Sequence, residues 1–318
     1  MAKPRVLLYE PIHEEGMRVL RAHAAPHLAS GRDEATIVRE VADAEGIVIR
    51  AQGAATARVM DAAPRLKVIG RHGVGVDNVD VQAATERSIW VVNTPHVVTE
   101  PVAEHVVGMM LALAKDFRNS DAHVRGGDWG YRDRFQGMEL RGRTLGVVGL
   151  GRIGFRVAGI CRKGLGMEIV YTDALPQPKA EDELEARRMD LMPLLEISDV
   201  VTLHTPYLPA THYLINAEAL RHVKPGAYLI NASRGKVVEQ AALVRALGER
   251  RIAGAALDVL ETEPPEKDNP LFALDNVLLT PHCATATTEA LIAMSLVAED
   301  VIAVLQGRRP RYPVNEPV

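Results

Sequence analysis

The chain has 318 residues, of which 47% are apolar, 25% are charged and only 4% are aromatic, with a formal net charge of −4. This length predicts two domains of ordinary size, and the composition excludes a disordered, collagenous or disulfide-stapled protein. The 37 basic and 41 acidic residues nearly balance, so no bulk field for nucleic acid is expected. Two cysteines are too few for a disulfide framework and are typical of a reducing compartment.

No segment has the pattern of a targeting signal or a membrane span. The N-terminus holds only a short apolar stretch that ends in charge, unlike a secretory signal. The longest apolar run, with glycine allowed, is Val106–Ala114, which is far too short to cross a bilayer. We therefore expect a cytoplasmic protein that binds neither membranes nor nucleic acid.

Short runs rich in β-branched residues alternate with helical patterns along the whole chain. Several of these runs are continuously apolar, as parallel strands covered on both faces are. Helical stretches such as Glu239–Arg250 and Thr287–Gln306 lie between them. The alternation predicts an α/β protein of doubly wound parallel sheets. In chain order the expected strands are Arg5–Tyr9, Gly46–Arg50, Leu66–Arg71, Ile89–Asn93, Thr144–Gly149, Glu168–Asp173, Val200–His204, Ala227–Asn231, Ile252–Val259 and Val277–Thr280.

The stretch Pro101–Arg118 predicts a helix without a polar face. It begins with a proline suited to a first helical turn, and apolar side chains then fall on almost every side. A helix of this kind is buried. The sequence leaves open whether it lies within one domain or between domains or subunits.

A glycine-rich turn carries the clearest functional signal. Gly149, Gly151 and Gly154 follow an apolar strand and open a helical pattern, and Asp173 ends the next strand. Such a turn lets a pyrophosphate approach the backbone at a helix N-terminus, while the acidic residue accepts hydrogen bonds from a ribose. Because a carboxylate at this point repels a 2′-phosphate, the motif predicts NAD rather than NADP. The alternative is a glycine turn that binds nothing.

Three polar side chains follow later strands of the second series, namely Arg234, Glu263 and His282. Ligands of open α/β sheets bind beyond the carboxyl ends of the strands, so we expect the three on one rim. An arginine binds carboxylates, a histidine exchanges protons near neutral pH, and a glutamate orients an imidazole and favours its charged form. Spacing alone does not prove that they converge.

At these residues the chain resembles the D-isomer-specific 2-hydroxyacid dehydrogenases, nearest to the phosphoglycerate dehydrogenase and hydroxypyruvate reductase branch. The resemblance extends over nearly the whole chain. It departs from the family pattern after His282, where Cys283 stands in place of the usual glycine. The stretches that carry it are Val68–Asn78, Val102–His105, Gly149–Gly154, His204–Pro206, Asn231–Gly235, Asp258–Pro265 and Pro281–His282.

The resemblance implies a Rossmann-type cofactor domain, residues 100–285, inserted into a flavodoxin-like substrate domain, residues 1–99 plus 286–318. It implies NAD-dependent hydride transfer with a small 2-hydroxy or 2-keto acid of the 3-phosphoglycerate, hydroxypyruvate or glyoxylate type. The implied catalytic residues are Arg234, Glu263 and His282. The implied cofactor contacts are Gly149, Gly151, Arg152, Ile153, Gly154, Asp173, His204, Thr205, Pro206, Ala232 and Asp258. The implied substrate contacts are Arg50, Arg71, Val74 and Gly75.

Arg50 and Arg71 match basic positions that meet a substrate phosphate in the phosphoglycerate dehydrogenase branch, and surface ion pairs are the alternative for both. The resemblance also implies a homodimer built on Pro101–Arg118. We expect no metal site, because Pro26 prevents His23 and His27 from sharing a helix face and no cysteines cluster.

Two other functions fit the same scaffold. One is a phosphite-type dehydrogenase; a formate dehydrogenase is disfavoured because that branch carries Gln where Glu263 stands. The other is an NAD-sensing, corepressor-like binding protein, which can keep the same three polar residues. Oxidation of NADH by 2-keto acids distinguishes an enzyme from a binding protein.

Overall fold

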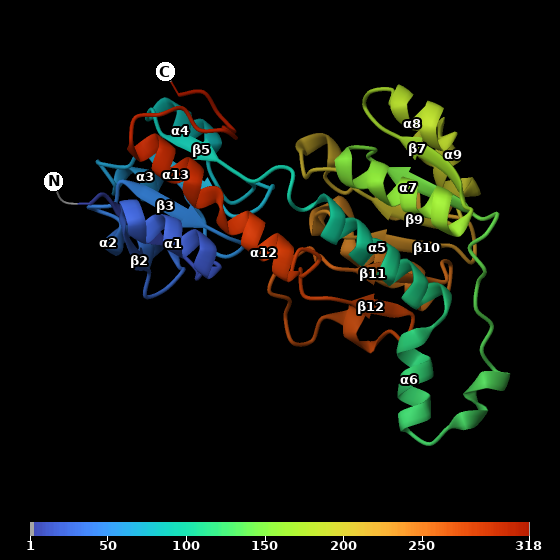
Figure 1. The fold of residues 1–318 in the computed structure, drawn as a ribbon. Coiled ribbons are helices and arrows are strands. Elements are labelled where there is room, and N and C mark those ends of the chain that lie inside the picture. Colours follow the sequence, from blue (N-terminus) through green and yellow to red (C-terminus); the bar gives the residue numbers. More distant parts are fainter. Residues whose placement is uncertain (1–2, 318) are drawn as a thin grey trace. The chain divides into compact units, whose positions relative to one another are not determined.

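The computed structural model describes residues 3–317 of the chain. The chain forms two compact units. Unit 1 comprises Met1–Val98 and Thr285–Val318, and unit 2 comprises Thr99–Ala284. Each unit contains one parallel sheet with helices on both faces (Figure 1), which confirms the expected α/β class. No helix within residues 3–317 is long and apolar enough to span a bilayer.

Unit 1 is built on a five-stranded sheet in the order β2-β1-β3-β4-β5, which is the flavodoxin-like order. Its strands are buried on both faces: Val6 and Leu8 face one helix layer, and Leu7 faces the other. The strands are β1 (Arg5–Leu8), β2 (Ala25–Leu28), β3 (Gly46–Ile49), β4 (Val68–Arg71) and β5 (Trp90–Val92). One face is covered by α1 (Glu14–His23) and α13 (Val297–Leu305), against which α12 (Thr288–Ser295) packs, and the other by α2 (Glu34–Glu40), α3 (Ala57–Asp61) and α4 (Val81–Glu86).

Unit 2 is built on a seven-stranded sheet in the order β12-β11-β10-β9-β6-β7-β8. Counted within the unit this is the Rossmann order with one further strand, and the order reverses between β6 and β9. The strands are β6 (Thr144–Val148), β7 (Glu168–Thr172), β8 (Arg187–Arg188), β9 (Val200–Leu203), β10 (Tyr228–Asn231), β11 (Gly254–Leu257) and β12 (Val277–Leu279).

The helices of unit 2 cover both faces of this sheet. Figure 1 shows α5 (Thr99–Ala114) and α7 (Arg152–Leu165) side by side on one face. The other face buries α9 (Leu191–Ile197), α10 (Ala217–His222) and α11 (Gln240–Gly248). The remaining elements are α6 (Phe117–Arg125), α8 (Pro178–Leu184) and the short 3-10 helices η1 (Trp129–Asp133), η2 (Pro209–Thr211), η3 (Gly235–Val237) and η4 (Pro270–Ala273).

The apolar helix lies in the core of unit 2, where its buried face packs on α7, β10 and β11. The prediction of one helix over Pro101–Arg118 was wrong at its C-terminal end. The helix ends at Ala114, Asp116 adopts a left-handed backbone with φ 49°, and α6 begins at Phe117. In Figure 1, α6 and η1 lead away from the sheet as an arm, which we define as residues 117–133.

The long C-terminal helix expected over Thr287–Gln306 is also divided. It forms α12 and α13, which meet at Leu296. Leu296 caps α12 by donating its backbone N–H to Ala293 and at the same time precedes the first turn of α13. Apolar periodicity continues across this junction, which explains why the sequence did not reveal it.

Candidate functional site

The glycine turn of unit 2 joins β6 to α7 at the point where the strand order reverses. Gly149 has φ 88°, and a Cβ atom there would lie 2.9 Å from the backbone of His204. A Cβ on Gly154 would lie 2.3 Å from the carbonyl oxygen of Gly149, so helix and turn are in direct contact. A Cβ on Gly151 would meet nothing within 4 Å. The first turn of α7 therefore faces open space, as a pyrophosphate requires.

The end of β9 lies against this turn and presents an unusual hydroxyl. Thr205 Oγ1 is buried, and within residues 3–317 it has no hydrogen-bond partner. Buried hydroxyls are normally paired, so this one fits a ligand donor or acceptor. The neighbouring His204 has its Nε2 3.0 Å from Thr202 Oγ1, and burial lowers the pKa of His204 to about 4. His204 is therefore a neutral imidazole at pH 7.

Asp173 lies just beyond β7 and contacts the same turn. Its Oδ2 accepts a hydrogen bond from the backbone N–H of Leu150 at 2.7 Å, so the carboxylate also holds the glycine turn in place. Arg188, on the edge strand β8, donates to the backbone oxygen of Asp173 at 3.0 Å. The sequence did not reveal this arginine, because it lies fifteen residues further along and only the sheet brings it to Asp173.

Asp258, just after β11, is the most tightly held carboxylate of the site. It is 2% exposed and accepts hydrogen bonds from the Thr280 hydroxyl at 2.6 Å and from the backbone N–H groups of Cys283 and Ala284 at 2.9 and 3.0 Å. Burial opposes its charge, but these bonds together with that of His105 outweigh burial and lower the pKa of Asp258 to about 2. The hydrogen bonds of Asp258 therefore fix the loop on both sides of His282.

Glu263 and His282 form a pair at the carboxyl ends of β11 and β12. The distance from His282 Nδ1 to Glu263 Oε2 is 2.7 Å, and the two side chains are 45% and 36% exposed. Burial raises the pKa of Glu263, but the hydrogen bond and charge of His282 outweigh it, so the pKa lies below its ordinary value. Its second oxygen accepts the Leu260 N–H at 2.9 Å. His282 has a left-handed backbone with φ 50°. Its N–H donates to the backbone carbonyl oxygen of Asp258 at 2.8 Å, which fixes this conformation.

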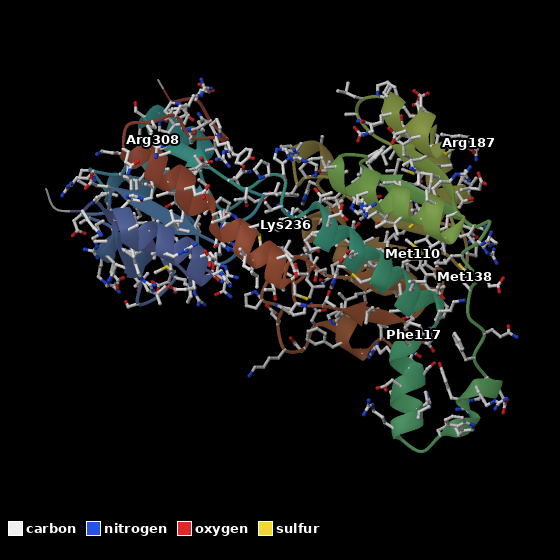
Figure 2. All side chains as sticks on the ribbon, viewed as in Figure 1. Met110, Phe117, Met138, Arg187, Lys236 and Arg308 are labelled. Carbon is white, nitrogen blue, oxygen red and sulfur yellow. The ribbon has the colours of Figure 1, made fainter. Side chains whose placement is uncertain are left out.

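Arg234 follows β10 on a turn that packs against the loop carrying Glu263. The side-chain amide of Asn231 donates to the carbonyl oxygen of Arg234 at 2.9 Å, and its oxygen accepts from Ser233. A Cβ on Gly235 would lie 1.8 Å from the carbonyl oxygen of Leu260, so the two loops touch backbone to backbone. Figure 2 shows the side chains of this region and labels Lys236 on η3. Glu263 and His282 are thus joined directly, and Arg234 is linked to them through loop packing.

The expected substrate contacts lie in unit 1, at and just beyond the carboxyl ends of β3 and β4. Arg50 donates to the carbonyl oxygen of Pro11 at 2.6 Å, and Arg71 donates to that of His72. The loop beyond is anchored by Gly73 N–H on Thr94 at 3.1 Å. Over residues 3–317, the backbone N–H groups of Val74 and Gly75 have no hydrogen-bond acceptor. Two such groups in succession suit an anion.

Two further residues lie near Asp258, and neither takes a catalytic role. His105 of α5 places its Nε2 3.1 Å from Thr280 Oγ1 and 3.5 Å from Asp258 Oδ1, so α5 also contributes a side chain to the site. Burial and the charge of Asp258 raise the pKa of Cys283, which keeps its thiol protonated. The donor atoms of His105, Asp258 and Cys283 lie within 4.8 Å of one another.

Comparison with known proteins adds the following. Residues 107–284 match the model of the family described as D-isomer specific 2-hydroxyacid dehydrogenase, NAD binding domain. The chain is 42% identical, over 315 residues, to D-3-phosphoglycerate dehydrogenase of Archaeoglobus fulgidus, covering 98% of this chain and 59% of that protein. It is also 42% identical, over 325 residues, to glyoxylate reductase of Korarchaeum cryptofilum, covering 99% and 97%. It therefore spans only about three fifths of the first relative and almost all of the second.

Solved structures resemble the whole chain. A Thermus thermophilus protein matches with a TM-score of 0.91 and 38% identity, covering 98% of this chain and 100% of that chain. The NADPH-dependent glyoxylate/hydroxypyruvate reductase of Sinorhizobium meliloti, solved with NADP and malonate, matches with a TM-score of 0.88 and 33% identity, covering 98% and 97%.

Proposed function

The chain belongs to the D-isomer specific 2-hydroxyacid dehydrogenase family and carries its NAD binding domain, and on that premise we propose that it is an oxidoreductase acting on small 2-hydroxy and 2-keto acids. The observation that carries this proposal is the 2.7 Å pair of Glu263 and His282, which lies in the NAD binding unit at the carboxyl ends of its strands. When bound, NAD supplies the acceptor or donor of the hydride.

His282 moves the proton in this proposal. Because Nδ1 faces Glu263, Nε2 is the ring atom left to meet the substrate oxygen. In oxidation it takes the hydroxyl proton, and in reduction it returns a proton to the developing alkoxide. Glu263 orients the ring through its bond to Nδ1. Its own pKa lies below the ordinary value, so it stays a carboxylate throughout.

Arg234 binds the substrate carboxylate and polarises the carbonyl oxygen in this scheme. Within unit 1, the backbone N–H groups of Val74 and Gly75, which donate to no acceptor among residues 3–317, are suited to bind a substrate carboxylate. Arg50 follows β3 and Arg71 ends the neighbouring strand β4, and both side chains of unit 1 favour a substrate with a phosphate or hydroxymethyl group.

We infer a preference for NAD over NADP. The glycine turn of Gly149, Gly151 and Gly154 with Arg152 and Ile153 receives the pyrophosphate, and Asp173 binds the adenosine ribose and repels a 2′-phosphate. The opposite side of the turn is formed by His204, Thr205 and Pro206. Within residues 3–317 the buried Thr205 hydroxyl has no hydrogen-bond partner, so it suits a contact with the cofactor. Ala232 and Asp258 are assigned to the nicotinamide end of the cofactor in this proposal. These are the residues that the sequence indicated for the cofactor.

The test is NADH oxidation, followed by absorbance, with glyoxylate, hydroxypyruvate, pyruvate and phosphohydroxypyruvate. We expect turnover with at least one of them. His282→Ala should lose on the order of 10²–10⁴-fold in turnover while its affinity for NADH stays unchanged, because positioned proton transfer contributes that much. Absence of turnover across the panel, or wild-type turnover in His282→Ala, would refute the proposal; the first result would favour a cofactor-sensing binding protein.

We also propose that the protein is a cytoplasmic homodimer formed through α5 and the arm. Both cysteines are free, which suits a reducing compartment. The arm exposes large apolar side chains, Phe117 at 59%, Val124 at 51% and Trp129 at 69%, and apolar groups gathered on one projecting element are typical of an interaction surface.

A further inference from the structure

Tyr213 of unit 2 has a backbone conformation that its side chain disfavours. It follows η2 and has φ 49°, in the left-handed region where a bulky residue is rare. Its ring stacks on that of His212, with centroids 3.9 Å apart. Strain of this kind persists only where the surroundings fix the residue, and it gathers at functional sites. The contacts of Tyr213 therefore merit a functional explanation.

The backbone of Tyr213 is bound to the turn that carries Arg234. Its N–H donates to the carbonyl oxygen of Lys236 at 2.9 Å, and the N–H of Ile215 donates to Val237 at 3.0 Å. The bridge between Ile215 and Val238 continues this pairing. Residues 213–215 therefore pair with the turn that carries Arg234 and hold it in place. We call these three residues the brace.

The side chain of Tyr213 is bound to the loop that carries Glu263. Its hydroxyl donates to Glu261 Oε1, and Glu261 Oε2 accepts the N–H of Gln240 at 3.0 Å. The bond to Glu261 raises the pKa of Tyr213, which keeps the phenol protonated as a donor. A neutral hydroxyl on a carboxylate is a charge-assisted bond and is stronger than a neutral pair.

The anchored loop leads directly to the reactive pair. Glu261 follows Leu260, whose N–H donates to Glu263 Oε1 at 2.9 Å, and Glu263 Oε2 holds His282 at 2.7 Å. The carbonyl oxygen of Leu260 also lies against Gly235, beside Arg234. Tyr213 thus contacts the Arg234 turn through its backbone and the Glu263 loop through its side chain.

We propose that Tyr213 is a positioning residue that fixes Arg234 relative to the Glu263–His282 pair. The inference rests on the proposed dehydrogenase function. Tyr213 touches neither substrate nor cofactor; it acts through Glu261 and Lys236. A displacement of the order of an ångström between groups that act on one substrate is costly in rate, which gives this brace its purpose.

The first test is Tyr213→Phe, which removes only the hydroxyl. We expect kcat for 2-keto acid reduction to fall about tenfold with KM for NADH unchanged, because cofactor contacts stay and the alignment loosens. The pH dependence of kcat should change, because Glu263 is then held less firmly against His282. Glu261→Ala removes the acceptor of the Tyr213 bond and should lower kcat at least as much. Adding Tyr213→Phe to Glu261→Ala should lower kcat no further, because the bond is already absent.

The matched control is Tyr171→Phe. Tyr171 also donates its hydroxyl to a glutamate, Glu181, at 2.5 Å in the same unit, but this pair joins β7 to α8 and contacts neither reactive loop. At saturating NADH this variant should lose some thermal stability and keep the wild-type kcat and pH profile. Tyr213→Gly separates strain from function: glycine accepts the left-handed backbone, so stability should be kept while kcat falls as in Tyr213→Phe.

An NMR measurement tests the brace without turnover. The Nδ1 proton of His282, protected by its bond to Glu263, should be visible in the wild type, broadened in Tyr213→Phe and retained in Tyr171→Phe. Wild-type kcat, pH profile and Nδ1 signal in Tyr213→Phe would overturn the inference. If the wild type turns over no substrate, the proposed function fails, and the Nδ1 signal still decides whether Tyr213 places Glu263.

Discussion

Single residues of the site gain their properties from backbone groups as much as from other side chains. The pairing of Glu263 with His282 could be predicted, because both residue types follow neighbouring strands and their chemistry is complementary. The hydrogen bonds by which Asp258 fixes the loop around His282 could not be predicted. They depend on the left-handed backbone of His282, which turns the N–H groups of Cys283 and Ala284 onto one carboxylate.

Asp258→Asn tests these hydrogen bonds through the free energy of unfolding and its pH dependence. The pKa of Asp258 is lowered from 3.8 to about 2, so its contribution is fully present above pH 3.8 and is lost as pH falls through 2. We expect the variant to lose about 2 kcal/mol of unfolding free energy at pH 7, and less at pH 3. Urea denaturation at both values measures this difference.

The control for this measurement is Asp182→Asn, because Asp182 is exposed on α8 and far from the site in the chain. It should unfold like the wild type at both pH values. A loss that is equal at pH 7 and pH 3 in Asp258→Asn would mean that the charge of Asp258 is not what holds the loop.

Secondary-structure elements were predicted well where both faces are buried. All ten expected strands form, because an unbroken apolar run between turn residues has few other solutions. The strands β2 and β8 were missed. β2 contains Pro26 and is mostly exposed, and β8 is the dipeptide Arg187–Arg188, with Arg187 labelled in Figure 2. Both are edge strands, so their sequences carry no apolar pattern.

The junction of β7 with the glycine turn decides which dinucleotide fits. Asp173→Arg should lower kcat/KM for NADH at least about tenfold and raise the NADPH to NADH ratio, because an arginine attracts a 2′-phosphate and the Leu150 hydrogen bond is lost. Steady-state kinetics with both cofactors measure this. Asp173→Asn keeps an acceptor for Leu150 without the charge, so it should accept NADPH better than the wild type but less well than the arginine variant. An unchanged preference in Asp173→Arg would disprove the role of this carboxylate.

At the scale of the whole molecule, periodicity predicts two parallel sheets but not their strand order. Each strand–helix–strand unit allows the next strand on either side of the sheet, and the handedness rule alone does not choose between them. The flavodoxin-like and Rossmann orders came from the family resemblance and are confirmed by the two sheets. Periodicity did not predict the arm either, because no residue of its helix α6 is buried and its sequence therefore lacks a core-facing apolar pattern.

The assembly proposal is tested through the arm. The chain mass is 34.6 kDa, and we expect sedimentation to give about twice that value. Replacement of Phe117, Val124 and Trp129 by serine should give a monomer with unchanged melting temperature, because these side chains are exposed in the chain itself. Leu28→Ser, at a 50% exposed site in unit 1, should remain dimeric. A wild-type monomer, or a dimeric triple variant, would contradict the proposal.

The strand order of unit 2 also places substrate chemistry and dinucleotide selection on different halves of the sheet, which matters for redesign. The side chains proposed to act on the substrate follow β10, β11 and β12, whereas those proposed to select the dinucleotide follow β6, β7 and β9. An engineer who wishes to run the enzyme on a cheaper or more abundant dinucleotide can therefore randomise the turns after β6 and β7 and leave the half of the sheet that carries the substrate chemistry intact.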